Sequence, residues 1–101
     1  MEISKHMYIS DLQPGMNRVI IDVEIVEKGP IREFNNFGRT GKVCEAKIQD
    51  KTGEYTLVLW NDECDKINQG DKIRIINGYT KRYQGEPQLN IGQYGKYEIL
   101  S

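Results

Sequence analysis

Aromatic residues and a lysine in the second half of the chain have the types and spacing that suit contact with unpaired nucleobases. Trp60 ends the alternating run TLVLW, and Tyr79, Lys81 and Tyr83 occupy every second position near the end of KIRIINGYTKRY. Side chains two residues apart on a strand point to the same face of a sheet. Aromatic rings on such a face can stack on bases while cations between them neutralise phosphates. We therefore expect these residues to form one nucleic-acid-binding face.

Other basic and aromatic residues are candidates for the same surface. Lys47 shares the outward face of its segment with Trp60, and Arg74 is a weaker candidate for a phosphate contact. The segment KGPIREFNNFGRTG, residues 28–41, is expected to be a long loop or a flexible hairpin tip that exposes Phe34 and Phe37 beside Arg32 and Arg39, and long loops are often functional. The alternative, that these two rings fold back onto the domain, stays open.

The distribution of charge is more informative than its sum. The formal net charge is −1, from 14 Lys and Arg against 15 Asp and Glu, which argues against a uniformly basic nucleic-acid binder. However, no acid occurs between Lys72 and Gly85, where several basic residues lie, so a local basic surface is expected. No segment is long and basic enough to be a recognition helix for duplex DNA. RNA remains an alternative ligand, because stacking surfaces accept either sugar.

The sequence gives no sign of catalysis or of a metal site. Cys44 and Cys64 have no paired-ligand spacing, and His6 has no second histidine to act with. Acids between Glu54 and Asp65 could hold Mg²⁺ in principle, but a solvated start of a short helix explains them better. We therefore predict that the protein is not an enzyme and has no metal or cofactor. The absence of an apolar span or signal sequence predicts an intracellular, cytoplasmic protein without a membrane partner.

The segments that must position these side chains are predicted to be β-strands. KVCEAKIQDKTGEYTLVLW alternates on both sides of Asp50–Gly53 and predicts a hairpin. Further strands are expected at 19–27, 72–83 and 88–91, the last interrupted at 92–95 before it resumes at 97–100. A short helix is expected at 61–68. A bulge at 76–78 would reverse the alternation, which keeps Lys81 out of the core.

This order of elements predicts an all-β domain. Five strands with one helical plug between the third and fourth fit a Greek-key OB-fold barrel, and an SH3-like barrel is the second choice. A chain of 101 residues suits one domain, so we expect a single domain over 1–101, with 1–9 as a loose lead-in.

Ordered motifs along nearly the whole chain add a family resemblance. The run from Ile9 to Leu100 resembles the archaeal single-OB single-stranded-DNA-binding proteins, their eukaryotic relatives and the OB domains of replication protein A. The resembling pieces are DLQPGM at 11–16, DKTG at 50–53, LVLW at 57–60, INQGD at 67–71, NGY at 77–79, YQG at 83–85 and QLN at 88–90.

The resemblance implies roles for particular residues. Base stacking falls on Trp60, Tyr79 and Tyr83, and Arg32 matches a basic position of the family, with Arg39 and Lys42 able to join it. The function it implies is sequence-tolerant binding of single-stranded DNA in replication, recombination or repair, by a monomer that works with other replication or repair proteins. The alternative is an OB domain that binds RNA, or binds protein within an assembly like replication protein A.

Overall fold

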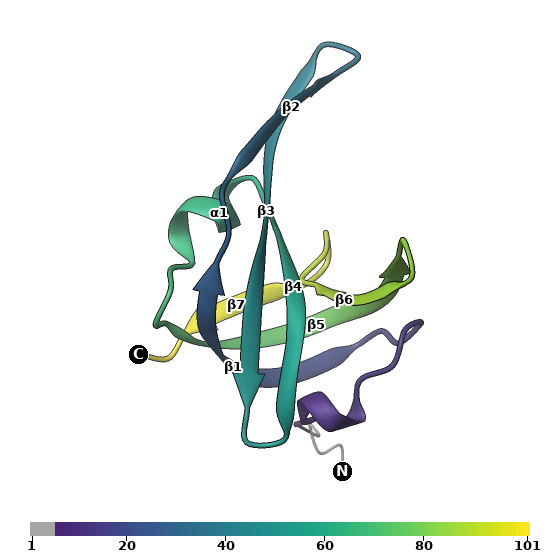
Figure 1. The fold of residues 1–101 in the computed structure, drawn as a ribbon, viewed down its shortest axis with the longest axis vertical. Coiled ribbons are helices and arrows are strands. Elements are labelled where there is room, and N and C mark those ends of the chain that lie inside the picture. The colour runs from purple at the N-terminus through teal and green to yellow at the C-terminus, as the bar shows by residue number, and fades with distance from the viewer. Residues whose placement is uncertain (1–5) are drawn as a thin grey trace.

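An antiparallel hairpin forms the longest pairing in the computed structural model, which describes residues 6–101. Strand β3 (Arg39–Asp50) and strand β4 (Gly53–Trp60) are paired from Val43 with Trp60 to Asp50 with Gly53 (Figure 1). The Asp50 carboxylate accepts hydrogen bonds from the backbone N–H and the hydroxyl of Thr52, at 2.7 and 2.6 Å, and so fixes the turn. The predicted hairpin is confirmed.

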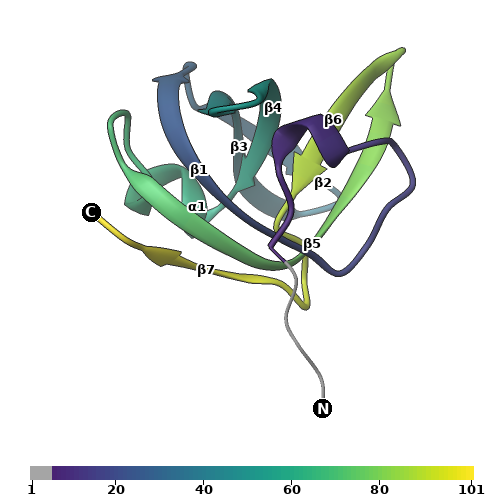
Figure 2. The ribbon, with the colours of Figure 1, turned by 90° about the horizontal axis from the view of Figure 1, so that it is seen from below.

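The remaining barrel strands curl around this hairpin until the sheet closes. Strand β1 (Val19–Lys28) pairs with β3 on one side and with β5 (Lys72–Tyr83) on the other, and β6 (Glu86–Asn90) lies between β4 and β5. The β4–β6 pairing is parallel and the other pairings of the ring are antiparallel. Figure 2 shows the strands wrapped around a common interior. This ring is the predicted OB-fold barrel.

Alternating apolar residues fill the interior of the ring. In β1, Val19, Ile21, Val23 and Ile25 are each at most 3% exposed, while the residues between them are only partly buried. Burial of each such side chain stabilises the fold by roughly 1.5–3 kcal/mol. The other strands contribute the rest of the core, which includes Cys44, Ile48, Leu57, Leu59, Ile73, Ile75 and Leu89.

Short helical segments cover the ends of the barrel. Helix α1 (Asp62–Lys66) lies between β4 and β5, where a helical plug was predicted, and buries Cys64, with Ile67 buried just after it. A 3₁₀ turn at Ile9–Asp11 buries Ile9. Within residues 6–101, no helix is long and apolar enough to cross a membrane.

The start of the chain differs from the expected loose lead-in. Met7 forms a parallel bridge with Ile21, and the Ile9 backbone N–H donates to the Asp50 carboxylate at 2.8 Å. These contacts attach the chain before residue 9. The part of the predicted lead-in at residues 1–5 lies outside the described residues.

The segment expected to be a long loop or a flexible hairpin tip forms a second hairpin. Strand β2 (Arg32–Asn36) pairs with the first half of β3, which makes β3 longer than predicted. The two-residue turn is Phe37–Gly38, with φ of +52° and +78°. Figure 1 shows this hairpin projecting well beyond the barrel.

The end of the chain forms the predicted interrupted strand, as two segments that both pair antiparallel with β5. Strand β6 pairs with Tyr79–Tyr83 of β5, and β7 (Lys96–Ile99) pairs with an earlier part of the same strand, from Ile73 with Ile99 to Ile76 with Lys96. Gly92, with φ of +84°, begins the connection that carries the chain from one position to the other.

Strand β5 contains the predicted bulge. Between the pairs Val19–Gly78 and Ile21–Ile75, one residue of β1 faces two residues of β5. Ile75 points into the core before the bulge and Thr80 is buried after it. The alternation is therefore reversed, and Tyr79, Lys81 and Tyr83 come to lie on the outer face, as the sequence predicted.

Candidate nucleic-acid interface

Two aromatic rings meet where the projecting hairpin leaves the barrel. Trp60 on β4 is 39% exposed and Phe34 on β2 is 38% exposed, and their rings lie edge to face with centroids 6.1 Å apart. The strand pairing explains the contact, because Val43 is opposite Trp60 and Gly41 is opposite Phe34. Gly41 leaves room for the Phe34 ring, since a Cβ there would lie 2.5 Å from its nearest atom.

The indole of Trp60 is held in place by a hydrogen bond at its polar edge. Its Nε1–H donates to Oδ1 of Asn90 at 3.1 Å, and the backbone N–H of Trp60 donates to the Glu63 carboxylate at 3.0 Å. Burial raises the pKa of Glu63, and the hydrogen bond from Trp60 opposes that shift. With its edge fixed, the indole keeps part of its surface open to solvent.

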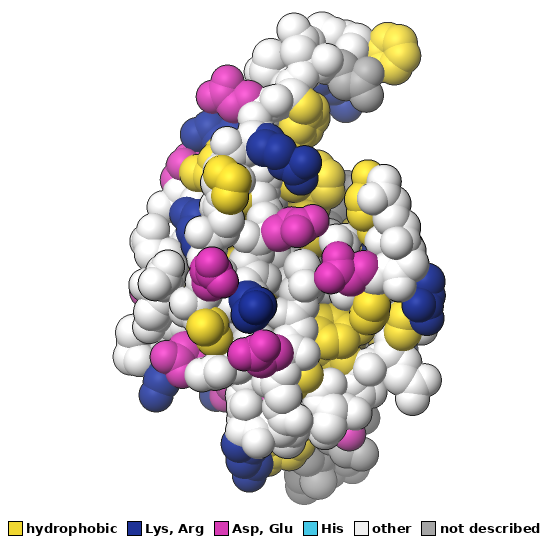
Figure 3. Space-filling model, viewed as in Figure 1, with side chains coloured by type: hydrophobic (Ala, Val, Ile, Leu, Met, Phe, Trp, Pro, Cys, Tyr) yellow, Lys and Arg dark blue, Asp and Glu magenta, His cyan; other side chains and the backbone are white. Residues whose placement is uncertain are grey.

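A groove of about 330 Å³ lies beside this aromatic pair. Strands β2 to β6 all contribute to its walls, among them Arg32, Phe34, Trp60, Lys81, Tyr83 and Asn90. Lys81 pairs with Gln88 and Tyr79 with Asn90 across β5 and β6, so these side chains share the face that carries Trp60. Figure 3 shows a hollow between the projecting hairpin and the barrel, with hydrophobic, basic and acidic side chains around it.

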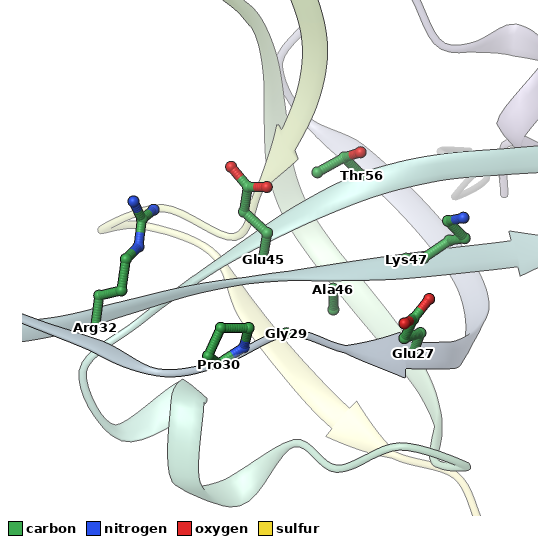
Figure 4. Close-up of a pocket in the computed structure, with 8 residues that line it drawn as sticks. All are labelled: Glu27, Gly29, Pro30, Arg32, Glu45, Ala46, Lys47 and Thr56. Atoms are coloured by element: carbon green, nitrogen blue, oxygen red, sulfur yellow. The ribbon is translucent and has the colours of Figure 1, made fainter.

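A second hollow continues the groove along β3. It shares Arg32 and Glu45 with the first and extends to Lys47 and Thr56 (Figure 4). In Figure 4 the side chains of Arg32, Glu45 and Lys47 project to the same side of the strands, while Ala46 projects to the other. The resulting surface alternates aromatic rings and charged groups over several strands, which suits an extended ligand that carries both apolar and anionic parts.

Residues 19–97 match the family described as "OB-fold nucleic acid binding domain". The chain belongs to this family. The single-stranded DNA binding protein Ssb of Saccharolobus solfataricus is 30% identical over 88 residues, which cover 87% of this chain and 60% of the relative. Replication factor A of Methanothermobacter thermautotrophicus is 35% identical over 68 residues, 66% of this chain and 9% of the relative. The chain therefore spans less than two thirds of the length of either relative.

The structural comparison agrees with the predicted family resemblance. The second OB-fold domain of replication protein A from Methanococcus maripaludis superposes with a TM-score of 0.78 and 25% identity, over 96% of each chain. The relatives are named for DNA binding and replication, in agreement with the prediction that this OB domain is not an enzyme.

The structure brings together most of the residues that the sequence singled out. Arg32, Phe34, Trp60, Lys81 and Tyr83 line the groove, and Lys47 lines its continuation. For Phe34 the sequence left two alternatives, exposure or packing back onto the domain. Both apply, because its ring packs edge to face with Trp60 while 38% of its surface stays exposed.

Tyr79 shares the face but has a different environment. Its ring is half-buried against Gly92, where an added Cβ would lie 2.8 Å from a Tyr79 ring carbon. Tyr83, by contrast, is 54% exposed and lies at the groove. The two tyrosines are therefore unequal as stacking surfaces.

Two of the predicted phosphate contacts are engaged elsewhere. Lys42 points away from the groove and pairs with Asp65 of α1 at 2.8 Å. Arg74 donates to both carboxylate oxygens of Asp22 on β1, at 2.8 and 3.1 Å, and its hydrogen bond holds the pKa of Asp22 below the ordinary value. The structure does not bring either cation to the groove.

The remaining candidates lie at the tip of the projecting hairpin. Phe37 is 99% exposed in the turn, and Arg39 is exposed beside it at the start of β3. Neither residue lines the groove.

The sequence reading missed the polar floor of the groove. Gln88 and Asn90 are 3% and 1% exposed, and Glu45 faces them from β3. Their alternation around Leu89 was the available signal, but alternation alone does not reveal a buried amide.

Two of the acidic residues near α1 are paired with other groups of this domain. Asp65 pairs with Lys42, and Glu63 accepts from Trp60. Among residues 6–101, no group of three or more His, Cys, Asp or Glu side chains is arranged to hold a metal ion.

Proposed function

We propose that this OB domain binds single-stranded DNA with little dependence on sequence, in replication, recombination or repair. The observation that supports this most directly is the groove in which Trp60 and Phe34 face Lys81 and Tyr83. Relatives named as a single-stranded DNA binding protein and a replication factor point to the same ligand.

Stacking supplies the affinity in this proposal. Unpaired bases lie against the exposed parts of Trp60, Phe34 and Tyr83, and each stacked base contributes roughly 1–3 kcal/mol. Every base has a π-face, so this contribution tolerates many sequences. Tyr79 is half-buried and supports the face more than it contacts the strand.

Phosphate neutralisation comes from a few cations instead of from the net charge. Arg32 and Lys81 line the groove and Lys47 lines its continuation, so a strand that crosses β3 and β4 meets positive charge along its path. Phe37 and Arg39 at the hairpin tip add contacts for a longer strand. Lys42 and Arg74 are left out of the proposed interface because each already has an acidic partner.

A titration of intrinsic tryptophan fluorescence tests the proposal, because Trp60 is the only tryptophan. A mixed-sequence DNA strand of about 12 nucleotides should quench the signal to saturation, since OB folds cover roughly 4–16 nucleotides. The logarithm of the association constant should fall with the logarithm of salt concentration at about −0.7 per neutralised phosphate. Absence of saturable quenching would refute DNA binding at this groove.

Two further measurements separate the alternatives. An RNA strand of the same sequence is titrated in the same way, and tighter binding of RNA than of DNA would reassign the ligand. Light scattering after size exclusion, with and without the strand, should give the mass of one chain. A homodimer that hides Trp60 would instead favour a role in protein assembly.

A further inference from the structure

Two buried thiols lie in a part of the fold that the groove does not use. Cys44 of β3 and Cys64 of α1 are both 0% exposed, and both are free. Neither side chain lines the groove or its continuation. Thiols have a redox chemistry that aliphatic side chains of similar size lack, so two neighbouring thiols are a candidate site for oxidation.

The strand pairing brings the two thiols to one place. Cys44 is directly opposite Leu59 in the β3–β4 hairpin, and residues opposite one another have Cα atoms about 4.5–5.5 Å apart. The Sγ–H of Cys64 donates to the carbonyl oxygen of the same Leu59 at 3.4 Å. Both cysteines belong to the same core cluster, and α1 lies beside β3 (Figure 1). Cys44 and Cys64 are therefore neighbours in space although about 20 residues separate them in the sequence.

The acid–base behaviour of Cys44 agrees with this contact. Burial raises its pKa to about 11, and a hydrogen bond between the two thiols contributes to the shift. A thiol with so high a pKa stays protonated at neutral pH and is a weak nucleophile. The first oxidation is therefore expected at Cys64.

Access to Cys64 depends on helix α1, which has only five residues. Outside the core, the helix is held by the salt bridge between Asp65 and Lys42 and by a hydrogen bond from Lys28 to the Cys64 carbonyl oxygen. None of these contacts belongs to the strand ladders of the barrel. The helix can therefore move outward and expose Cys64 while the strands stay paired, and such local opening costs less than global unfolding.

We infer that Cys44 and Cys64 form an intramolecular disulfide when the protein reacts with hydrogen peroxide, and that this bond fastens α1 to β3. Peroxide first oxidises the Cys64 thiol to a sulfenic acid and releases one water. The Cys44 sulfur then attacks the sulfenic sulfur, so that the S–S bond forms as the S–O bond breaks. The hydroxyl leaves with the Cys44 proton as a second water. The two thiols lose two electrons and two protons, which the peroxide takes up, and a thiol reductant reverses the bond.

This bond should stabilise the fold and leave the groove unchanged. It closes a loop of about 20 residues, which restricts the unfolded chain. The melting temperature of the oxidised protein should therefore rise by about 10 °C or more. Cys44 points into the core whereas its neighbour Glu45 lines the groove, so the affinity for DNA should stay the same. The inference goes beyond the proposed function and does not depend on it.

Peptide mapping tests the bond directly. The folded protein is treated with a small excess of hydrogen peroxide and unfolded, its free thiols are blocked with N-ethylmaleimide, and it is digested with trypsin. The two cysteines fall in the tryptic peptides 43–47 and 52–66, neither of which contains methionine. The expected product is these two peptides joined, two hydrogens lighter than their sum, from a protein with the mass of one chain. Two blocked peptides, oxygen adducts without linkage, or linkage only between two chains would each overturn the inference.

Matched variants connect the rise in stability to this pair. Cys64→Ser keeps a donor for the Leu59 carbonyl oxygen and removes one thiol, so peroxide should give neither the linked peptides nor a rise in melting temperature. Cys44→Ala should behave in the same way. In the parent, dithiothreitol should restore both the free peptides and the original melting temperature. A melting temperature that falls when the linked peptides form would show that the fold does not accommodate the bond, and would also overturn the inference.

Discussion

Trp60 at the end of β4 and Phe34 in β2 meet edge to face, with their planes at 81° and their centroids 6.1 Å apart. This contact joins the projecting hairpin to the barrel at the groove. Because the edge of one ring meets the face of the other, both keep exposed surface, at 39% and 38%. The hairpin therefore contributes the Phe34 ring to the proposed stacking surface and also helps to position Trp60.

Replacement of Trp60 should have the largest effect on binding. Trp60→Ala removes a stacking surface and should weaken DNA binding by about 1–3 kcal/mol, measured by anisotropy of a labelled strand. Trp60→Phe keeps a ring but loses the hydrogen bond to Asn90, so its loss should be smaller. If Trp60→Ala bound DNA as tightly as the parent, the groove would not be the binding site.

Replacement of Tyr83 should lower DNA affinity, whereas replacement of Tyr79 should mainly lower thermal stability. Tyr83→Ala should weaken DNA binding by about 1 kcal/mol or more with little change in thermal stability, because Tyr83 is 54% exposed. Tyr79→Ala should mainly lower the melting temperature, since it removes packing against Gly92. Equal losses of affinity in the two variants would show that Tyr79 also contacts the strand.

This contrast shows how far the sequence could predict the site. Alternation and the bulge between Ile75 and Gly78 correctly placed Tyr79, Lys81 and Tyr83 on one face, because these features depend on neighbours in the chain. The burial of Tyr79 depends on Gly92, which follows the next strand. The alternation of residues around Tyr79 cannot predict a contact with a residue that far along the chain.

The missed strand and the engaged cations have similar causes. REFNN of β2 has one apolar residue and no alternation, so its strand character comes from pairing with β3. Lys42 and Arg74 look like free cations until the fold brings Asp65 and Asp22 to them. The order of strands and the helical plug were predictable because each follows from a run of several residues.

The salt dependence of binding should identify the cations that contact phosphate. Lys81→Gln and Arg32→Gln should each reduce the magnitude of the salt slope by about 0.7. Lys42→Gln and Arg74→Gln are matched controls with the same loss of charge, and their slopes should stay near that of the parent because both residues are paired away from the groove. Equal reductions in all four variants would indicate a general charge effect instead of specific contacts.

Asp50 should make stability depend on pH at the acid end. Burial tends to raise its pKa, but hydrogen bonds from Thr52, Ile9 and Gly53 outweigh burial and hold the pKa below the ordinary value. The unfolded chain therefore binds the proton more readily, so this contribution to stability is present above about pH 4 and is lost as the pH falls through the folded pKa.

Asp50→Asn tests this linkage. It should destabilise the fold at neutral pH by about 1 kcal/mol, because the hydrogen bonds lose their charged acceptor. Denaturant unfolding below about pH 4 should show a smaller difference between the variant and the parent than at neutral pH. A difference that stayed constant across this range would show that the charge of Asp50 does not contribute.

We expect Phe37 at the hairpin tip to contribute to DNA contact and not to the stability of the fold. It is 99% exposed and has a φ of +52°, a conformation that is unfavourable for a bulky side chain. Asparagine adopts this conformation readily, and Asn–Gly is a favoured two-residue hairpin turn. Phe37→Asn should therefore leave thermal stability unchanged or slightly raised.

The same variant should lose affinity only for longer strands. A strand of about six nucleotides fits within the groove and should bind Phe37→Asn as it binds the parent, whereas a strand of about 16 nucleotides reaches the tip and should lose the stacking of one base, roughly 1–3 kcal/mol. Phe37→Tyr keeps a ring in the turn and should bind both strands normally. Equal binding of the long strand by Phe37→Asn and the parent would mean that the hairpin tip does not contact DNA, and that the strand leaves the groove before it reaches Phe37.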